Sequence, residues 1–265
     1  MPTNKILILD RNIVSIIKSV NEGSHPLRPD QLEMICYLRR NDRNVTAVTP
    51  LLSIIEGQAG APESPDEMEK TIEEEGAALQ PFFQKARVDS GYLLASAKST
   101  SQIFVDSDAQ YNAKYDCFLK EANQLLVNKV KKNDRWSVKE KVCDLACKHG
   151  VPLGHPVVMC CLSALFGLGY SRKLLKFKQS GYEPYNARSD LLIISRLFRI
   201  KHSAKKVNPN IRVKFLSLDK ALQEFISMVD VTSTVLQEDG IELEVHYNKK
   251  LFPDLTEKEY LKLAN

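Results

Sequence analysis

Hydrophobic and polar positions follow two different periods near the start of the chain. Residues 6–9 form a short apolar run with polar neighbours, which predicts a buried strand of a parallel sheet. After Asp10 the apolar positions recur every three or four residues, as on one face of a helix: Ile13, Ile16, Ile17 and Val20. Asp10 is therefore predicted to lie where a strand passes into a helix.

The position of Asp10 has two explanations. In open α/β sheets, ligands bind beyond the carboxyl ends of the strands, so a carboxylate placed there points into the binding crevice. Aspartate is also among the residues preferred at helix N-caps. Taken alone, Asp10 is better explained as a cap, and it indicates a site only if other carboxylates converge on it.

A second strand-to-helix junction of the same kind follows near the C-terminal end. Residues 211–216 predict a strand and residues 220–228 a helix, with Ser217, Leu218 and Asp219 between them. Asp219 thus repeats the position of Asp10. An alternating pattern over residues 241–247 predicts one further strand.

Two more acidic residues lie early on predicted helices. Residues 45–48 predict a second strand, and Thr49-Pro50 is typical of a cap followed by an N1 proline. This places Glu56 in the second turn of an apolar helix. A helix that opens at Asn186 holds Asp190 in its first or second turn. Carboxylates among apolar residues are seldom buried unless they are paired or bind a metal.

The middle of the chain is expected to be helical. Three S-x-x-E/Q capping patterns, which start at Ser64, Ser107 and Ser137, predict three helix starts. The length of 265 residues fits one large domain. We therefore expect a single α/β domain over residues 1–265, with a central, mostly parallel sheet flanked by helices in three Rossmann-like layers and a helical insertion at residues 62–180. That insertion is the expected place for a regulatory protein partner.

Positive charge is concentrated in one segment. Residues 129–220, called the basic segment below, hold 20 lysines and arginines against 6 aspartates and glutamates, whereas the whole chain has a net charge of +4. Such an excess favours a polyanionic partner such as nucleic acid, although solvated helix faces rich in lysine are the plainer alternative. The candidate nucleic-acid contacts are Lys131, Lys132, Arg172, Lys173 and Lys176.

Membrane insertion and secretion are not expected. The uncharged stretch at residues 151–171 is interrupted by Pro152, Gly154 and Pro156, and the remainder is shorter than the roughly 20 residues of a membrane span, so it predicts a buried helix. The six cysteines lack the regular spacing of a disulfide framework, and no signal peptide is visible, which favours the cytoplasm. Cys143 and Cys147, one helical turn apart, are expected to be small core residues rather than zinc ligands.

Four acidic residues, Asp10, Glu56, Asp190 and Asp219, now share one type of location. If they converge, their charges repel one another and require cations. Oxygen-rich acidic clusters suit Mg²⁺ or Mn²⁺, and such ions beside a phosphate-attracting surface support phosphodiester hydrolysis. Asn12 and Ser217 are expected to support the site by orienting Asp10, Asp219 or a metal-bound water through hydrogen bonds.

The order of these motifs resembles the PIN-like nuclease domains. That family carries an Asp after its first strand, often as D-x-N, which Asp10-Arg11-Asn12 matches. It next places a Glu on an early helix after the second strand, as Glu56 stands here. The family also has an Asp in an apolar helix of the C-terminal half, similar to Asp190, and a T/S-x-D motif after a strand, similar to residues 217–219.

The resemblance covers about residues 5–60 and 185–247, and the long helical stretch between them departs from compact family members. It implies a metal-dependent nuclease with the four acids as catalytic residues and metal ligands. Because most members of the family are ribonucleases, it also implies RNA rather than DNA as the substrate.

Two other functions are kept open. A haloacid-dehalogenase-like phosphatase also has an Asp after its first strand, but it needs a second Asp two residues later, where this chain has Asn12. The other alternative is a non-catalytic interaction module on the same fold, since a fold does not imply a function. The presence of all four acids counts against that module.

Overall fold

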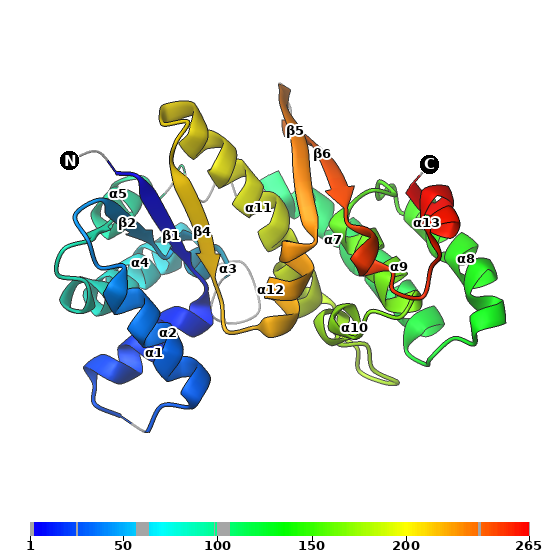
Figure 1. Cartoon of the computed structure of the whole chain (residues 1–265), viewed down its shortest axis with the longest axis horizontal. Coiled ribbons are helices and arrows are strands. Elements are labelled where there is room, and N and C mark those ends of the chain that lie inside the picture. The colour runs from blue at the N-terminus through cyan, green and yellow to red at the C-terminus, as the bar shows by residue number, and fades with distance from the viewer. Residues whose placement is uncertain are drawn as a thin grey trace. The chain divides into compact units, whose positions relative to one another are not determined.

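The chain divides into two compact units in the computed structural model (Figure 1). Unit 1 comprises Met1–Ser107 and Arg196–Asp219, and unit 2 comprises Asp108–Ser195 and Lys220–Asn265. The structure describes residues 3–24, 26–56, 64–97, 99, 107–237 and 240–264.

Unit 1 contains a four-stranded parallel sheet. Its strands are β1 (Lys5–Leu9), β2 (Thr46–Thr49), β3 (Arg87–Val88) and β4 (Arg212–Leu216), in the order β3-β2-β1-β4. The central strand β1 is buried on both faces, because Leu7, Ile8 and Leu9 are all fully inaccessible to solvent. The predicted α/β architecture with a parallel sheet flanked by helices is thereby confirmed.

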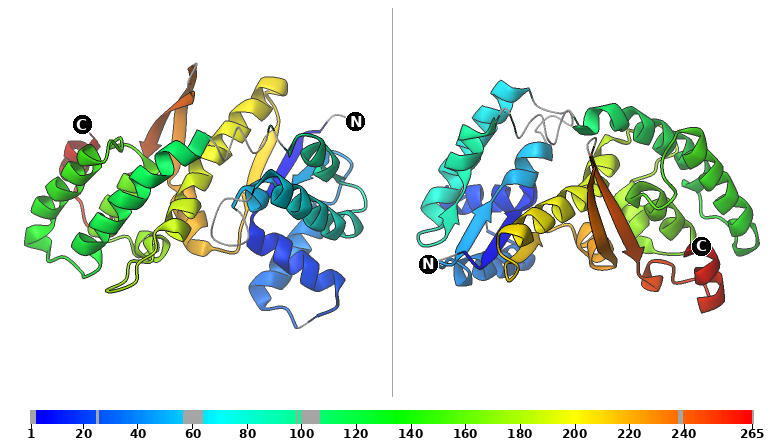
Figure 2. Two further views of the ribbon diagram at one scale, coloured as in Figure 1. Left: turned by 180° about the vertical axis from the view of Figure 1, so that it is seen from behind. Right: turned by 90° about the horizontal axis from the view of Figure 1, so that it is seen from above.

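Helices accompany the sheet in the first part of unit 1. Those with bounds among the described residues are α1 (Arg11–Asn21), α2 (Pro29–Arg40), α3 (Leu51–Glu56), α4 (Pro65–Phe82) and α5 (Ser90–Ala95). One apolar cluster joins β1, β2 and β4 to α1, α2 and α4, and a second joins α3, α4 and α5. The contact between α1 and α4 can be followed in both views of Figure 2. The predicted capping box at Ser64 is present, with Glu67 as its partner at the start of α4.

Unit 2 is mostly helical and has one strand hairpin. Its helices are α7 (Ser107–Leu126), η2 (Lys132–Asp134), α8 (Arg135–Lys148), α9 (Pro156–Leu165), α10 (Gly169–Leu175), the first part of α11 (Tyr185–Val207), α12 (Lys220–Ser227), η3 (Lys249–Leu251) and α13 (Glu257–Ala264). Every residue of α9 is buried, as the uncharged stretch predicted. The serine of this helix, Ser163, contacts the hydroxyl of Ser171 at 2.7 Å and donates a hydrogen bond to the carbonyl of Leu251 at 2.8 Å.

The predicted helical insertion and the observed second unit cover different residues. The stretch from α4 to α5 lies inside the predicted insertion but belongs to unit 1, because β3 pairs with β2 and extends the sheet. The predicted strand at 241–247 is β6 (Gly240–Tyr247), but it pairs antiparallel with β5 (Val229–Gln237) instead of joining the parallel sheet (Figure 2). A hairpin needs only a short connection, whereas a parallel neighbour requires a long crossover.

All six cysteines are free thiols. The prediction that Cys143 and Cys147 are core residues was wrong, because Cys147 is exposed and Cys143 is only partly buried. Among the described residues, no helix combines the length and apolar character needed to cross a membrane.

Candidate active site

Asp10 is buried at the carboxyl end of β1, with 5% of its surface exposed. It is the N-cap of α1, since its Oδ1 atom accepts a hydrogen bond from the backbone N–H of Arg11 at 2.8 Å. Its own N–H donates to the carbonyl of Leu216 at 2.9 Å, which ties it to the end of β4. The cap explanation is therefore correct, but it accounts for only one of the two carboxylate oxygens.

The second oxygen of Asp10 is held by the two predicted supporting residues. Asn12 donates from Nδ2 to Oδ2 of Asp10 at 2.6 Å, and the Ser217 hydroxyl donates to the same atom. The amide of Asn12 also links the two junctions, because its Oδ1 atom accepts from the N–H of Leu218 at 2.8 Å. One local bond from Asn12 and one long-range bond from Ser217 thus fix the orientation of the Asp10 carboxylate.

Asp219 lies beside Asp10 because β1 and β4 are neighbouring strands, with Leu9 paired to Leu216. The backbone N–H of Asp219 donates to the Ser217 hydroxyl at 2.9 Å, so one serine contacts both acids. Burial raises the pKa of Asp10 above its usual range, and the charge of Asp219 raises it further, while the bonds from Ser217, Arg11 and Asn12 oppose this shift. A cation at this position would offset both the desolvation of the Asp10 carboxylate and its repulsion by the Asp219 charge.

The other two predicted acids occupy different parts of the structure. Glu56 is the last residue of α3, which contacts β1 and α1 and begins directly after β2. Asp190 lies in the second turn of α11, in the part of the helix that belongs to unit 2, and its Oδ2 atom accepts from Nζ of Lys176 at 2.8 Å. The structure brings Asp10 and Asp219 together, whereas the convergence of all four acids stays a prediction.

The groups around Asp10 determine whether a divalent cation could bind there. Within the described part of the chain, no group of three or more His, Cys, Asp and Glu side chains is placed to hold a metal ion. Mg²⁺, however, is often bound by one or two carboxylates and several waters. A carboxylate offers about four acceptor positions, and Asp10 uses three of them. Asp10 and Asp219 therefore fit a hydrated Mg²⁺ or Mn²⁺ ion.

A further acidic residue, at the carboxyl edge of the sheet, was not predicted. Asp89 follows β3, and its N–H donates to the carbonyl of Val48 at the end of β2. Desolvation raises its pKa to about 6, and a hydrogen bond from the Thr49 side chain only partly opposes this shift. Its Oδ1 atom has no hydrogen-bond partner among the described residues. The two-residue strand β3 is too short to show a periodic signal, and only the position of an Asp immediately before a helix could have identified it.

Asp89 and Asp10 follow strands that are not neighbours. The strand β2 lies between β1 and β3, so their strands are roughly 10 Å apart in the hydrogen-bonding direction. Asp89 is an ionisable group with a perturbed pKa, a property that is common at functional sites but also occurs in structural networks.

Asp89→Asn is expected to stabilise the protein at pH 7 by up to about 3 kcal/mol. The folded-state pKa of about 6 exceeds the usual value of 3.8, so the native state binds more protons between these values and loses stability as the pH rises through them. Chemical denaturation at pH 7 and at pH 4 measures the effect, which should be absent at pH 4. An Asp89→Asn variant that is no more stable than wild type at pH 7 would show that the carboxylate is well solvated.

The candidate nucleic-acid contacts fall into two groups. Lys131 and Lys132 are exposed at η2, and Lys173 is exposed on α10. Arg172 is partly buried and donates to the carbonyls of Leu126 and Val127 at 2.9 and 3.1 Å, so its guanidinium stabilises the C-terminal end of α7. Arg172 therefore has a structural role at α7 besides its predicted role in nucleic-acid binding. Charge reversal at Arg172 would affect folding as well as binding.

Two further side chains of the basic segment have structural partners. Lys176 is the left-handed C-cap of α10 and pairs with Asp190. Trp136 packs against Phe166, with ring centroids 5.5 Å apart, which favours a role in the core of unit 2 over stacking on a base.

Comparison of the chain with protein-family models, with curated proteins and with solved structures finds no match. Its function is therefore inferred from the residues of the site themselves.

Proposed function

We propose that unit 1 is a metal-dependent nuclease domain of PIN-like type that hydrolyses phosphodiester bonds, with RNA as the first substrate to test. The observation that carries this proposal is the pair Asp10 and Asp219 at the ends of adjacent parallel strands, held by the Asn12 and Ser217 side chains. Ligands of α/β sheets bind at this edge.

The chemistry divides between the ion and the chain. A bound Mg²⁺ or Mn²⁺ would generate the attacking hydroxide and stabilise the leaving oxygen. Asp10 and Asp219 would hold that ion, while Asn12 and Ser217 keep the Asp10 carboxylate in one orientation. Glu56, which lies in the same unit, is proposed as an additional ligand on the basis of the motif order alone.

A haloacid-dehalogenase-like phosphatase is less well supported. That chemistry needs an acid two residues after the first Asp, and here Asn12 fills the position with both ends of its amide in use, towards Asp10 and towards Leu218. A non-catalytic module has no need of a buried carboxylate with an unfavourably raised pKa.

Incubation of the purified chain with single-stranded RNA, single-stranded DNA and a small phosphate monoester, each with Mn²⁺ or with chelator, separates these functions. We expect Mn²⁺-dependent cleavage of RNA and no release of phosphate from the monoester. Hydrolysis of the monoester alone would favour the phosphatase, and inactivity on all three substrates would favour the non-catalytic module.

The exposed lysines are expected to contribute substrate affinity rather than chemistry. Reversal of Lys131, Lys132 and Lys173 to Glu should weaken RNA binding. It should also reduce the magnitude of the slope of log K against log salt concentration by about 2, because each phosphate contact contributes roughly 0.7. Titration at several salt concentrations measures this slope, and cleavage of saturating RNA should change little. The control Lys85→Glu, exposed in unit 1, should leave the slope unchanged. A triple variant with the wild-type slope would show that these lysines only form a solvated surface.

A further inference from the structure

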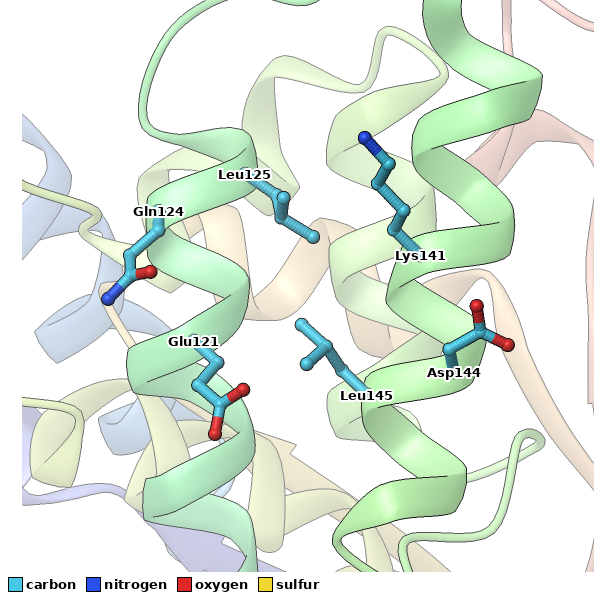
Figure 3. Close-up of a pocket in the computed structure, with 6 residues that line it drawn as sticks. All are labelled: Glu121, Gln124, Leu125, Lys141, Asp144 and Leu145. Carbon is cyan, nitrogen blue, oxygen red and sulfur yellow. The ribbon is translucent and has the colours of Figure 1, made fainter.

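Two hollows lined by described residues of unit 2 differ in the charge of their linings. Figure 3 shows the first, of about 300 Å³, between α7 and α8, where Leu125 and Leu145 point toward each other. Its lining carries both signs of charge, and Glu121 already pairs with Lys148 and His149. This hollow gives no indication of a ligand class.

The second hollow has a volume of about 390 Å³, near the lower limit for small-molecule sites. It is bounded by α8, by the loop before α9, by α9 itself, by β6 and by α13. Its apolar walls consist of Leu153, Met159, Leu162, Val245 and Leu263. Leu153 is 47% exposed at the edge of this hollow.

Two tyrosines hold the walls of this second hollow in place. The hydroxyl of Tyr247 donates to the carbonyl of Gly154 at 2.8 Å, and the hydroxyl of Tyr260 donates to the carbonyl of Tyr247. The first bond connects β6 to the loop before α9, and the second connects α13 to β6. Because the elements are tied to one another, the hollow exists before a ligand binds, which lowers the entropic cost of binding.

The polar part of the lining is positively charged. Lys139 and Lys262 line the hollow together with His246, and the described lining contains no carboxylate. Lys139 forms an ion pair with its exposed neighbour Glu140 at 3.2 Å, and pairs of this kind contribute little energy. An apolar interior beside two ammonium groups complements a small molecule with an apolar body and one negative charge.

We propose that this hollow is a binding site for a small apolar anion, such as an aromatic carboxylate or sulfonate. The apolar body contacts the leucine, methionine and valine side chains of the walls, and the anionic group contacts Lys139 and Lys262. The site is independent of the Asp10 region and of the nuclease proposal, since all its lining residues belong to unit 2.

Two fluorescent dyes with the same ring system test the proposal on the full chain. 8-Anilinonaphthalene-1-sulfonate carries the negative charge, and N-phenyl-1-naphthylamine lacks it. We expect saturable binding of the sulfonate and at least tenfold weaker binding of the neutral amine. Equal affinity for the two dyes, or no saturable binding of the sulfonate, overturns the proposal.

A pair of double variants locates the charge contact. Lys139→Gln combined with Lys262→Gln should raise the Kd of the sulfonate at least tenfold. The control combines Lys141→Gln and Lys258→Gln, which removes the same charge from the same two helices outside the hollow and should leave the Kd within twofold of wild type. Thermal melts verify that all variants are folded. Equal Kd values for the two double variants contradict the assigned contacts.

Two cysteines on one helix provide a second readout that requires no substitution. Cys143 lines the hollow, whereas Cys147 is exposed one turn further along α8 and does not line it. Alkylation with N-ethylmaleimide at pH 8.5, followed by peptide mass spectrometry, should be at least fivefold slower at Cys143 when the sulfonate is saturating. The rate at Cys147 should stay the same. No protection of Cys143, or equal slowing at both thiols, shows that the dye binds elsewhere.

Discussion

Replacement of Asp10 or Asp219 by Asn is expected to lower Mn²⁺-dependent RNA cleavage by more than a hundredfold. Loss of a residue that merely supports a metal ligand costs 10 to 100-fold, and loss of the ligand itself should cost more. Asn12→Ala and Ser217→Ala should fall within that smaller range, because these side chains orient Asp10 without carrying its charge. Single-turnover cleavage of saturating RNA measures all four variants.

The same two Asp→Asn variants should melt at an equal or higher temperature than wild type when chelator is present. Asp10 ionises with a raised pKa because of its burial and the neighbouring Asp219 charge, so neutralising either acid relieves an unfavourable interaction. Asparagine also caps helices well, which preserves the start of α1. Added Mn²⁺ should stabilise wild type, by about 2.7 kcal/mol at a hundredfold excess over Kd, and should stabilise the variants much less.

Asp66→Asn is the matched control for these melts. Asp66 is exposed in the first turn of α4 in the same unit, so its loss should alter neither cleavage nor the Mn²⁺ effect. A wild-type melt that does not respond to Mn²⁺, combined with destabilised Asp10 and Asp219 variants, would reduce both acids to structural caps. An Asn12→Ala variant as inactive as Asp10→Asn would instead show that Asn12 takes part directly.

Acidification from pH 6.5 to pH 4 is expected to remove up to about 3 kcal/mol of stability through His155 alone. His155 is the N-cap of α9, where its Nδ1 atom accepts from the N–H of Val157 at 3.3 Å. Its ring stacks on Tyr115, with centroids 4.5 Å apart. Burial lowers the pKa of His155 from 6.5 to about 4, so the native state holds the imidazole in its neutral form.

The sign of this effect follows from proton binding. Between pH 6.5 and pH 4 the unfolded chain protonates His155 and the native chain does not, so stability is complete above the unfolded pKa and falls as the pH drops. Protonation would also remove the Nδ1 lone pair that caps α9. Asp89 acts in the opposite direction over an overlapping range, because its raised pKa makes protonation favour the native state.

Variants of His155 separate its contribution to the pH dependence of stability from that of Asp89. His155→Asn keeps a capping residue at this position and cannot titrate. In denaturation experiments, the free energy of unfolding of wild type minus that of this variant should therefore decline by up to about 3 kcal/mol from pH 6.5 to pH 4. The control His246→Asn alters an exposed ring on β6 and should reproduce the wild-type profile. A His155→Asn profile parallel to that of wild type would show that His155 titrates normally in the folded protein.

The sequence by itself determined the elements whose signals are local. The apolar run of β1, the periodic pattern of α1 and the uncharged stretch of α9 each reflect burial of a single element, and burial is visible in the pattern of residue types. The strand-to-helix position of Asp10 and Asp219 was predictable for the same reason. That both acids lie at the same edge of the sheet was also predictable, because the carboxyl ends of parallel strands lie at one edge.

Tertiary structure alone decided which segments pair and which charges meet. The strand β3 has two residues and no periodicity, so its place beside β2, and with it the raised pKa of Asp89, depends on contacts between residues some 40 positions apart. The pairing of β6 with β5, rather than with the parallel sheet, and the bonds of Arg172 to the end of α7 are likewise long-range or depend on the connection between elements. Residue patterns report burial, whereas hydrogen bonds and ion pairs require two groups within a few ångströms, and only the folded chain fixes that distance.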